Sequence, residues 1–497
     1  MNYERMVTGK RKREVTIDAP KTSKKTATKA PNADIKKSNA TANGKTASTG
    51  ASTVNEDDAL NVQIVTGSYE RILHGFSARI PHHLFQTKAG KVEKSNRADT
   101  GVSFSDTFLF AAHTSAIRCL ALSPGAEANK RLLATGSSDE RINLYSISTA
   151  PPSSSTSKPN LPTLASTPVS ENSRNRSLGS LVHHDRAITS LHFATKTKLF
   201  SGAEDSTIAI SRTRDWTVLS SIKAPIPKPS GRPSGDTAGP GEFPAGINDF
   251  AIHPSQKLML SVGRGERCMR LWNLMTGKKA GVLNFDRDLL MQVGETRHSS
   301  GESRRVLWAE DGGSFVVGFE RGAAVFGIDS KPTGIIKPSP STKLHQMKFL
   351  PQADNILVAS TEDGRILFFH TETPSSEDID VKNLPICACV GQLGGRDAGF
   401  PGRIKDFDII PLSSTKKDEV SHLVVTASSD GAIRLWALDG IDASASSDGK
   451  AKEVGKLLGT HETGNRITCM GAFVMDGVDT ADDVESDGDE DVNSDDE

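Results

Sequence analysis

Residues 422–436 read HLVVTASSDGAIRLW, and this stretch decides the fold. Leu423–Val425 is a short apolar run of the kind that forms a strand covered on both faces. Ser428–Gly431 follows as a tight turn, in which an Asp side chain bonds the local backbone and a Gly tolerates a positive φ. Ala432–Trp436 then forms a second strand that ends in an aromatic residue. The stretch predicts a β-hairpin. One hairpin is weak evidence for a fold, so the next question is whether the pattern recurs.

The same order of hydroxyl, acidic turn and aromatic residue recurs six times along the chain. The copies are VTGSYERILHGF at 65–76, ATGSSDERINLY at 134–145, FSGAEDSTIAIS at 200–211, LSVGRGERCMRLW at 260–272, VVGFERGAAVF at 316–326 and VASTEDGRILFF at 358–369. Some copies are degenerate, because Ser211 replaces an aromatic residue and 316–326 lacks the hydroxyl. The pattern resembles the repeat of the WD family, and a recurring strand–turn–strand unit predicts a β-propeller.

An alternating apolar segment, which suits an inner strand, precedes every hairpin except the first. A matching segment without a hairpin, NRITCMGAFV, lies near the other end of the chain at 465–474. The simplest closure places Arg466–Val474 beside Val62–Phe76 in one blade, which removes the open sheet edges. We therefore predict an all-β fold, a seven-bladed WD-repeat β-propeller over 61–475, closed by its N- and C-terminal strands.

The two ends of the chain differ from the ring in composition. Residues 1–60 are rich in Lys, Thr, Ala and Ser and hold few large apolar side chains, so we predict a disordered basic tail. Residues 476–497 contain no Lys or Arg, which predicts a disordered acidic tail. In that tail Ser486 and Ser494 precede acidic residues and are candidate phosphorylation sites, with a plain solubilising tail as the alternative.

Four consecutive cations in the basic tail predict a nuclear import signal. They are Lys10, Arg11, Lys12 and Arg13. The alternative is a solvated basic tail without a targeting role, since short basic clusters are common. The opposite charge of the two tails favours the targeting interpretation.

The better-formed repeats carry polar residues that we expect to form a buried hydrogen-bond chain. The fullest set is His113, Thr135, Asp139 and Tyr145, and a partial set is His184, Ser201 and Asp205. Ser, His and Asp also make up a hydrolase triad, but here they repeat from blade to blade and no GxSxG turn accompanies them. We therefore predict no enzymatic activity and assign a structural role to these residues and to Trp272, Asp363, Asp430 and Trp436.

Other candidate sites are weak. Gly263–Gly265 lacks a following phosphate-binding helix, and the pairs His82-His83 and His183-His184 are isolated. The five cysteines show no CxxC spacing, which argues against a zinc site or a disulfide framework. No apolar run reaches the roughly 20 residues that span a bilayer. We therefore expect no cofactor, no metal, no small-molecule substrate and no membrane contact.

Several segments make the family resemblance more specific. They are VTGSYERILHGF, LVHHDRAITSLHF with LFSGAEDSTIAI, FAIHPSQKLMLSVG with RLWNLMTGK, and VVTASSDGAIRLW with RITCM. In this order, from Val62 to Val474, the chain resembles the family of p21-activated-kinase-interacting protein and the fungal maintenance-of-killer WD protein. Segments 149–177 and 224–245, rich in Ser, Pro and Gly, depart from the compact family pattern and predict loops between blades.

The resemblance implies a non-enzymatic WD-repeat scaffold that acts in large ribosomal subunit biogenesis, in pre-ribosome assembly and rRNA maturation. The implied partners are pre-ribosomal proteins, with ribosomal RNA as a further candidate, and the implied location is the nucleus and nucleolus. In animals the family is also linked to inhibition of p21-activated kinase. The alternative is therefore a signalling adaptor that binds and restrains such a kinase, although no kinase-contacting motif maps onto this chain.

Overall fold

The structure is a computed structural model, and the part of the chain that it describes is dominated by β-strands. The described residues are 59–85, 101–125, 129–151, 172, 174–226, 245–296, 299–353, 355–372, 383–400, 402–412, 421–438 and 452–476. Residues 1–58 of the predicted basic tail, with Lys10–Arg13, lie outside these ranges, whereas residues 59 and 60 belong to the first strand; Ser486 and Ser494 of the predicted acidic tail also lie outside. Most of the two predicted loops, 149–177 and 224–245, also lies outside them.

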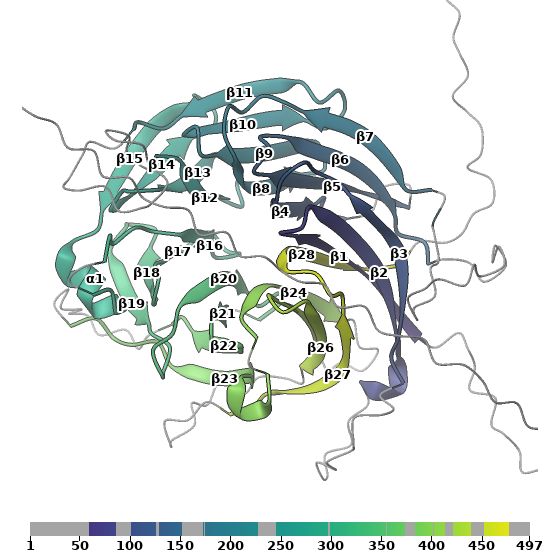
Figure 1. The fold of residues 1–497 in the computed structure, drawn as a ribbon. Helices are drawn as coiled ribbons and strands as arrows, with labels where there is room; N and C mark the ends of the chain where they lie inside the picture. Colours follow the sequence, from purple (N-terminus) through teal and green to yellow (C-terminus); the bar gives the residue numbers. More distant parts are fainter. Residues whose placement is uncertain are drawn as a thin grey trace, which may run out of the picture. The chain divides into compact units, whose positions relative to one another are not determined.

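The described strands form seven four-stranded antiparallel sheets, arranged as blades around a central opening (Figure 1). Blade 1 contains β1 (Ala59–Ser68), β2 (Ile72–Pro81), β3 (Ser103–Ala111) and β28 (Ile467–Val474). Blade 2 contains β4 (Ile117–Leu122), β5 (Lys130–Ser137), β6 (Ile142–Ser148) and β7 (Arg176–Leu181). Blade 3 contains β8 (Ile188–Thr195), β9 (Lys198–Ala203), β10 (Thr207–Arg212) and β11 (Val218–Lys223).

The other blades repeat this order. Blade 4 contains β12 (Ile247–Ile252), β13 (Leu258–Gly263), β14 (Cys268–Asn273) and β15 (Lys278–Asn284). Blade 5 contains β16 (Arg305–Trp308), β17 (Ser314–Gly318), β18 (Ala323–Gly327) and β19 (Pro332–Ile336). Blade 6 contains β20 (Leu344–Phe349), β21 (Ile356–Thr361), β22 (Arg365–His370) and β23 (Cys389–Gly394). Blade 7 contains β24 (Ile404–Leu412), β25 (Ser421–Ser428), β26 (Ala432–Leu438) and β27 (Gly455–Glu462).

Short helices occur only between strands of the described chain. They are α1 (Arg287–Val293) between blades 4 and 5, η1 (His82–Leu84) after β2 and η3 (Arg396–Ala398) after β23. None of these helices has the length and apolar character that a membrane crossing requires. The predicted seven-bladed β-propeller is confirmed.

The ring closes where the last strand of the chain pairs with the first. The yellow β28 lies against the purple β1 in Figure 1, with Val62 opposite Val474 and Thr66 opposite Met470. A backbone bond of 2.8 Å from Tyr69 N to Arg466 O continues this pairing beyond the strand ends. Blade 1 thus takes its inner strand from the opposite end of the chain, as the spare C-terminal segment predicts.

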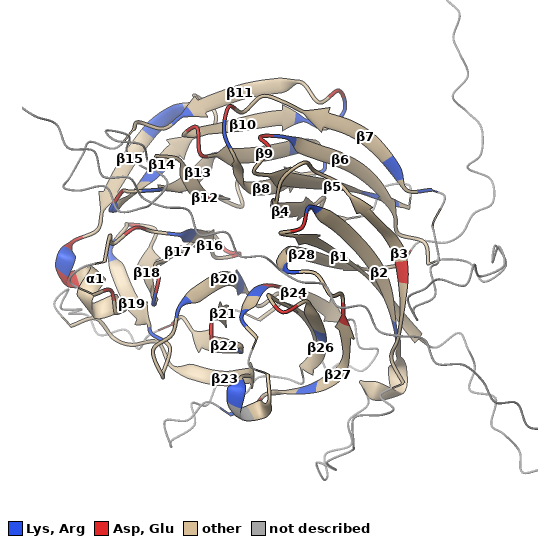
Figure 2. Ribbon diagram, in the orientation of Figure 1, with Lys and Arg blue, Asp and Glu red and all other residues tan. Residues whose placement is uncertain are grey.

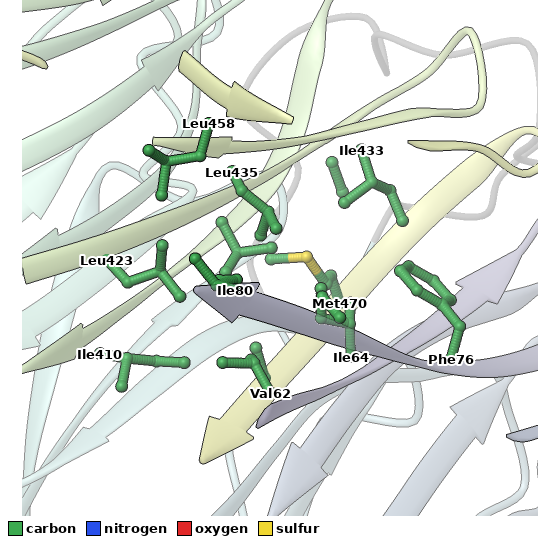
Figure 3. Close-up of a cluster of buried hydrophobic side chains, with 14 of the residues drawn as sticks. Val62, Ile64, Phe76, Ile80, Ile410, Leu423, Ile433, Leu435, Leu458 and Met470 are labelled. Atoms are coloured by element: carbon green, nitrogen blue, oxygen red, sulfur yellow. The ribbon is translucent and has the colours of Figure 1, made fainter. Parts of the chain in front are cut away.

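The apolar core lies between neighbouring blades. At the seam of blades 7 and 1, Ile64 and Phe76 pack in one cluster with Leu435, and all three are fully buried (Figure 3). Met470 of the closing strand belongs to the same cluster. Burying a large aliphatic or aromatic side chain contributes about 1.5–3 kcal/mol, so each seam is held mainly by apolar burial.

The inner strands are also linked to one another by side-chain bonds, which we call the collar. The collar includes Thr189 Oγ1 to Ile247 O (2.6 Å), Thr468 Oγ1 to Ile117 O (2.6 Å), Met470 N to Asp406 Oδ2 (2.9 Å) and Ala472 N to Asp408 Oδ2 (2.9 Å). Each bond joins a side chain of one blade to the backbone of the next blade along the ring. The collar therefore satisfies backbone groups that the inner edge of each sheet would otherwise leave unpaired.

Candidate functional site: the mouth of the ring

The predicted polar set of blade 2 comes together in one buried turn. His113 Nε2 lies 2.9 Å from Thr135 Oγ1, and His113 Nδ1 lies 3.1 Å from Asp139 Oδ2. Burial lowers the pKa of His113, although the charge of Asp139 opposes the shift. The ring is therefore neutral at neutral pH, so Nδ1–H donates to the carboxylate and Nε2 accepts the Thr135 hydroxyl.

Blade 3 repeats this arrangement. His184 Nε2 lies 2.8 Å from Ser201 Oγ, and His184 Nδ1 lies 2.9 Å from Asp205 Oδ2. Burial alone would raise the pKa of Asp205, but hydrogen bonds from His184 and Thr207 outweigh it and lower that pKa to about 2. Thr135 and Ser201 are buried, and each hydroxyl is hydrogen-bonded to a His ring, so neither is placed to attack a substrate.

The aromatic residue at the end of the predicted hydrogen-bond chain makes different contacts in different blades. Tyr145 makes no hydrogen bond to Thr135; its ring meets Phe110 edge-on at 5.7 Å and lines a groove of about 570 Å³ beside β3 and β7. Trp272 Nε1 does donate to Ser261 Oγ at 2.8 Å, and Trp436 Nε1 donates to Thr426 Oγ1 at 3.3 Å. Tyr145 also makes a side-chain hydrogen bond with Asn143, whose Nδ2 lies 3.5 Å from His113 Nδ1, so it joins the polar set of blade 2 through Asn143 and not through Thr135.

The other two predicted acids stiffen their own turns. Asp363 accepts from Arg365 Nε at 2.9 Å, and Asp430 Oδ1 accepts the backbone N–H of Ala432 at 3.0 Å. Both turns lead into the third strand of a blade, where a bonded carboxylate holds the turn conformation. The geometry gives all the predicted repeat residues structural contacts, and none of them converges on an open reaction site.

A different set of side chains gathers around one end of the central opening. Inner strands begin at the same face as the turns between second and third strands, as Ile117 opposite Ser137 and Ile404 opposite Ser428 illustrate. Several cations lie on these starts and turns, and we call seven of them the basic mouth: Arg118, Arg264, Arg304, Lys343, Arg403, Lys405 and Arg466. Figure 2 shows blue segments near the starts of β16, β20, β24 and β28, around the opening.

Carboxylates bridge the cations of neighbouring blades. Glu204 pairs with Arg118 at 2.7 Å and with Arg264 at 3.1 Å. Glu320 pairs with Lys343 at 2.7 Å and with Arg304 at 3.3 Å. At each of these two points two cations share one carboxylate, so each bridge keeps one net positive charge.

Several cations of blades 5, 6 and 7 lie close to one another. Burial lowers the pKa of His345 to about 4, and the charges of Lys405, Arg304 and Arg403 add to this shift. Burial also lowers the pKa of Lys405, and the neighbouring Arg403 adds to the effect more strongly than Glu362 opposes it. Lys405 makes no ion pair with a described residue. Lys405 is therefore the cation of this sector that can pair with an anionic group of a partner.

An exposed aromatic residue extends the basic mouth into blade 1. Tyr69 is 59% exposed, and the Arg466 guanidinium lies 5.3 Å from the centre of its ring. Tyr and Arg are enriched among the residues that dominate protein–protein binding energy. Sequence reasoning missed the mouth, because its members come singly from different blades and share no motif.

The comparisons with known proteins agree with the repeat pattern. A sequence model of the family described as "WD domain, G-beta repeat" matches residues 104–146 and 175–210. Both matches fall on strands of blades 1 to 3, within a ring of seven four-stranded blades. The chain is a WD-repeat β-propeller.

The relatives of this WD-repeat β-propeller cover most of the chain. The p21-activated protein kinase-interacting protein 1-like of Gallus gallus is 26% identical over 416 residues, which are 83% of this chain and 80% of the relative. Protein MAK11 of Saccharomyces cerevisiae is 26% identical over 440 residues, which are 83% of each chain. Shk1 kinase-binding protein 15 of Schizosaccharomyces pombe is 29% identical over 240 residues, 46% of this chain and 50% of the relative. The family resemblance stated from the sequence is confirmed.

Proposed function

We propose that this protein is a non-enzymatic scaffold of large ribosomal subunit assembly that works in the nucleus and nucleolus. The observation that carries the docking role is the basic mouth, where cations from several blades lie close together on one face of the ring. The ribosomal context rests on the family resemblance and on the Lys10–Arg13 cluster of the tail. Buried hydroxyls that are hydrogen-bonded to a His ring in the His–Asp turns support a non-enzymatic role.

The partner that suits the basic mouth is an acidic protein segment of a pre-ribosomal factor. Ribosomal RNA suits it less, because the cations alternate with Glu204, Glu320 and Glu362 and form no continuous track for a phosphate backbone. The side chains of Arg304, Lys343 and Arg403 remain 47%, 42% and 48% exposed, so a partner can replace water around them. Tyr69 beside Arg466 supplies a rigid anchor of the kind that protein interfaces favour.

Charge reversal at the mouth tests this proposal. The combined Arg403→Glu, Lys405→Glu and Arg466→Glu protein should fold but lose most of the pre-ribosomal proteins that co-purify with a tagged wild-type chain. The matched control reverses Lys223, Lys278 and Lys279 on the exposed outer strands β11 and β15, and should keep them. Equal recovery of partners by both variants would contradict docking at the mouth, and loss of partners on RNase treatment would assign the contact to RNA.

A kinase adaptor is the second candidate, because relatives carry the names p21-activated protein kinase-interacting protein and Shk1 kinase-binding protein. Depleting the protein separates the two. The scaffold proposal expects a fall in large subunits, and replacing Lys10–Arg13 with Ala should cause the same fall through loss of nuclear import. Normal large-subunit levels after depletion, with a kinase bound to the tagged chain in the cytoplasm, would favour the adaptor.

A further inference from the structure

A cluster of metal-binding side chains lies at the seam where the ring closes. His74 on β2 and Asp106 on β3 belong to blade 1, and His461 on β27 belongs to blade 7. One ligand atom from each of the three residues lies within 4.8 Å of the other two. Among the described residues, this is the one group of three His, Cys, Asp or Glu side chains that meets this distance.

The cluster also contains buried nitrogen atoms that the protein itself does not satisfy. His74 is only 6% exposed, and its Nδ1 has no hydrogen-bond partner, whereas its Nε2 lies 2.8 Å from Asp106 Oδ1. His461 Nε2 is likewise buried without a partner. Buried polar atoms without partners are rare in proteins, and a missing ion is one of their ordinary explanations, which applies here to His461 Nε2; His74 faces Asp106 with its other nitrogen, Nε2.

The aromatic surroundings fix the position of His461. Its ring stacks on Phe104 with the ring centres 5.0 Å apart, and it lies 4.7 Å from the ring of Phe76. An imidazole held by packing loses little further freedom when it binds an ion. The apolar shell also limits access of water, which strengthens coordination.

We propose that His74, Asp106 and His461 bind a divalent ion of borderline softness, with Zn²⁺ as the first candidate. Two imidazole nitrogens and one carboxylate oxygen form a common zinc ligand set, with water in the fourth position. Ligand atoms about 2.0 Å from a tetrahedral ion are roughly 3.3 Å apart. The His74–Asp106 pair is already at 2.8 Å, and rotation of the His74 and Asp106 side chains closes the remaining distance to the fixed His461, which is at most 4.8 Å.

Binding of the ion moves a proton within the His74 ring. In its hydrogen bond to Asp106, His74 Nε2 carries the N–H proton; for Nε2 to bind the ion that proton moves to Nδ1, the other nitrogen of the same ring. The bound ion would join β27 of blade 7 to β2 and β3 of blade 1. The closing seam would then be held by coordination as well as by apolar packing, which no other seam of the described chain offers.

The test uses the full-length protein after removal of metals with a chelator. Addition of ZnCl₂ should give one equivalent of bound Zn²⁺ by elemental analysis, and the thermal midpoint should rise in proportion to the logarithm of the Zn²⁺ concentration. Co²⁺ in place of Zn²⁺ should give the visible absorption of a four-coordinate ion with nitrogen and oxygen ligands. Absence of both signals in the wild-type protein would overturn the proposal.

Two variants locate the ion at this cluster. His461→Phe keeps the aromatic stack and removes a ligand nitrogen, and Asp106→Asn keeps a carbonyl oxygen as acceptor for His74 and removes the charge. Both should lose the equivalent of Zn²⁺ and the rise in midpoint. His345→Gln is the matched control, because His345 Nε2 is also buried without a partner but lies in no such cluster. Unchanged Zn²⁺ binding by Asp106→Asn and His461→Phe would place the ion elsewhere and refute the assignment.

Discussion

The hydroxyl of Thr135 is fully buried and ties His113 to the strand that precedes its turn. Its removal leaves His113 Nε2 in the protein interior without a partner, while Asp139 still holds the other side of the ring. The same geometry recurs at Ser201 and His184 in blade 3. A single hydroxyl in these turns thus has more effect on stability than its size indicates, since an unsatisfied buried atom carries the full desolvation cost.

Thr135→Val tests this effect with almost no change in side-chain volume. We expect a loss of about 1–3 kcal/mol in the free energy of unfolding, measured by denaturant titration. Thr460→Val is the control, because Thr460 lies exposed on β27 and should change stability by less than about 0.5 kcal/mol. Equal effects of the two substitutions would show that the buried turn contributes nothing beyond strand propensity.

His345 should make folding stability depend on pH. Its pKa of about 4 in the folded protein lies below the usual value of 6.5, because burial and the cations of the mouth disfavour the charged form. Between pH 6.5 and 4, His345 is therefore protonated in the unfolded chain but mostly neutral in the folded protein. The free energy of unfolding consequently falls as pH falls through this window. His345→Gln should reduce the slope of stability against pH in this window.

Measurements at pH 8 serve as the internal control, because His345 is neutral there in both the folded and the unfolded state. Any difference between the wild-type protein and His345→Gln at pH 8 reports packing alone. The additional difference at pH 4.5 reports the proton that His345 binds in the unfolded state but not in the folded state. Parallel curves from pH 8 to pH 4.5 would contradict the depressed pKa.

Among the elements, β28 is the strand that closes the ring, and it makes contacts on both of its sides. It pairs with β1 along one side, and Asp406 and Asp408 of blade 7 bind its backbone on the other. Its Met470 also enters the apolar cluster of the closing seam. No other strand in the described chain joins segments so far apart in the sequence.

Truncation from Asn465 onward should therefore open the ring. We expect a large fall in the thermal midpoint and association of the protein through the unpaired edge of β1, detected by light scattering. Truncation from Gly477 onward, which removes only residues after the last described one, is the control and should leave the midpoint unchanged. A monomeric protein with a normal midpoint after the longer truncation would show that closure by β28 is dispensable.

The strands could be predicted because their signals are local. Alternation of apolar residues and the chemistry of tight turns lie within about ten residues, and residues such as Asp430 and Trp436 mark each hairpin. The closing strand could also be predicted, because the first hairpin has no inner strand before it and the last predicted strand has no hairpin after it. The route by which Tyr145 joins the polar set could not be predicted, because it runs through Asn143, which the repeat pattern does not single out.

The functional surfaces could not be predicted in this way. The basic mouth takes Arg118, Lys343 and Arg466 from three different blades, and only the common direction of the inner strands brings them to one face. The metal cluster takes His74 and His461 from the two ends of the ring. Such sites form only when the ring closes. Their residues lie far apart in the sequence and share no motif, so a sequence pattern cannot predict them.

For the whole molecule, the pairing of β1 with β28 sets the order in which the protein can be completed. About 400 residues separate Ser68 from Ile467, and at roughly 5–20 residues per second a ribosome needs roughly 20–80 seconds to make them. Blades 2 to 7 can each form as soon as their four consecutive strands emerge, but blade 1 has to wait with one edge uncovered until synthesis is nearly over. A chaperone that shields nascent chains would therefore be needed first and longest at β1, and premature termination anywhere before β28 would release a product with that edge exposed.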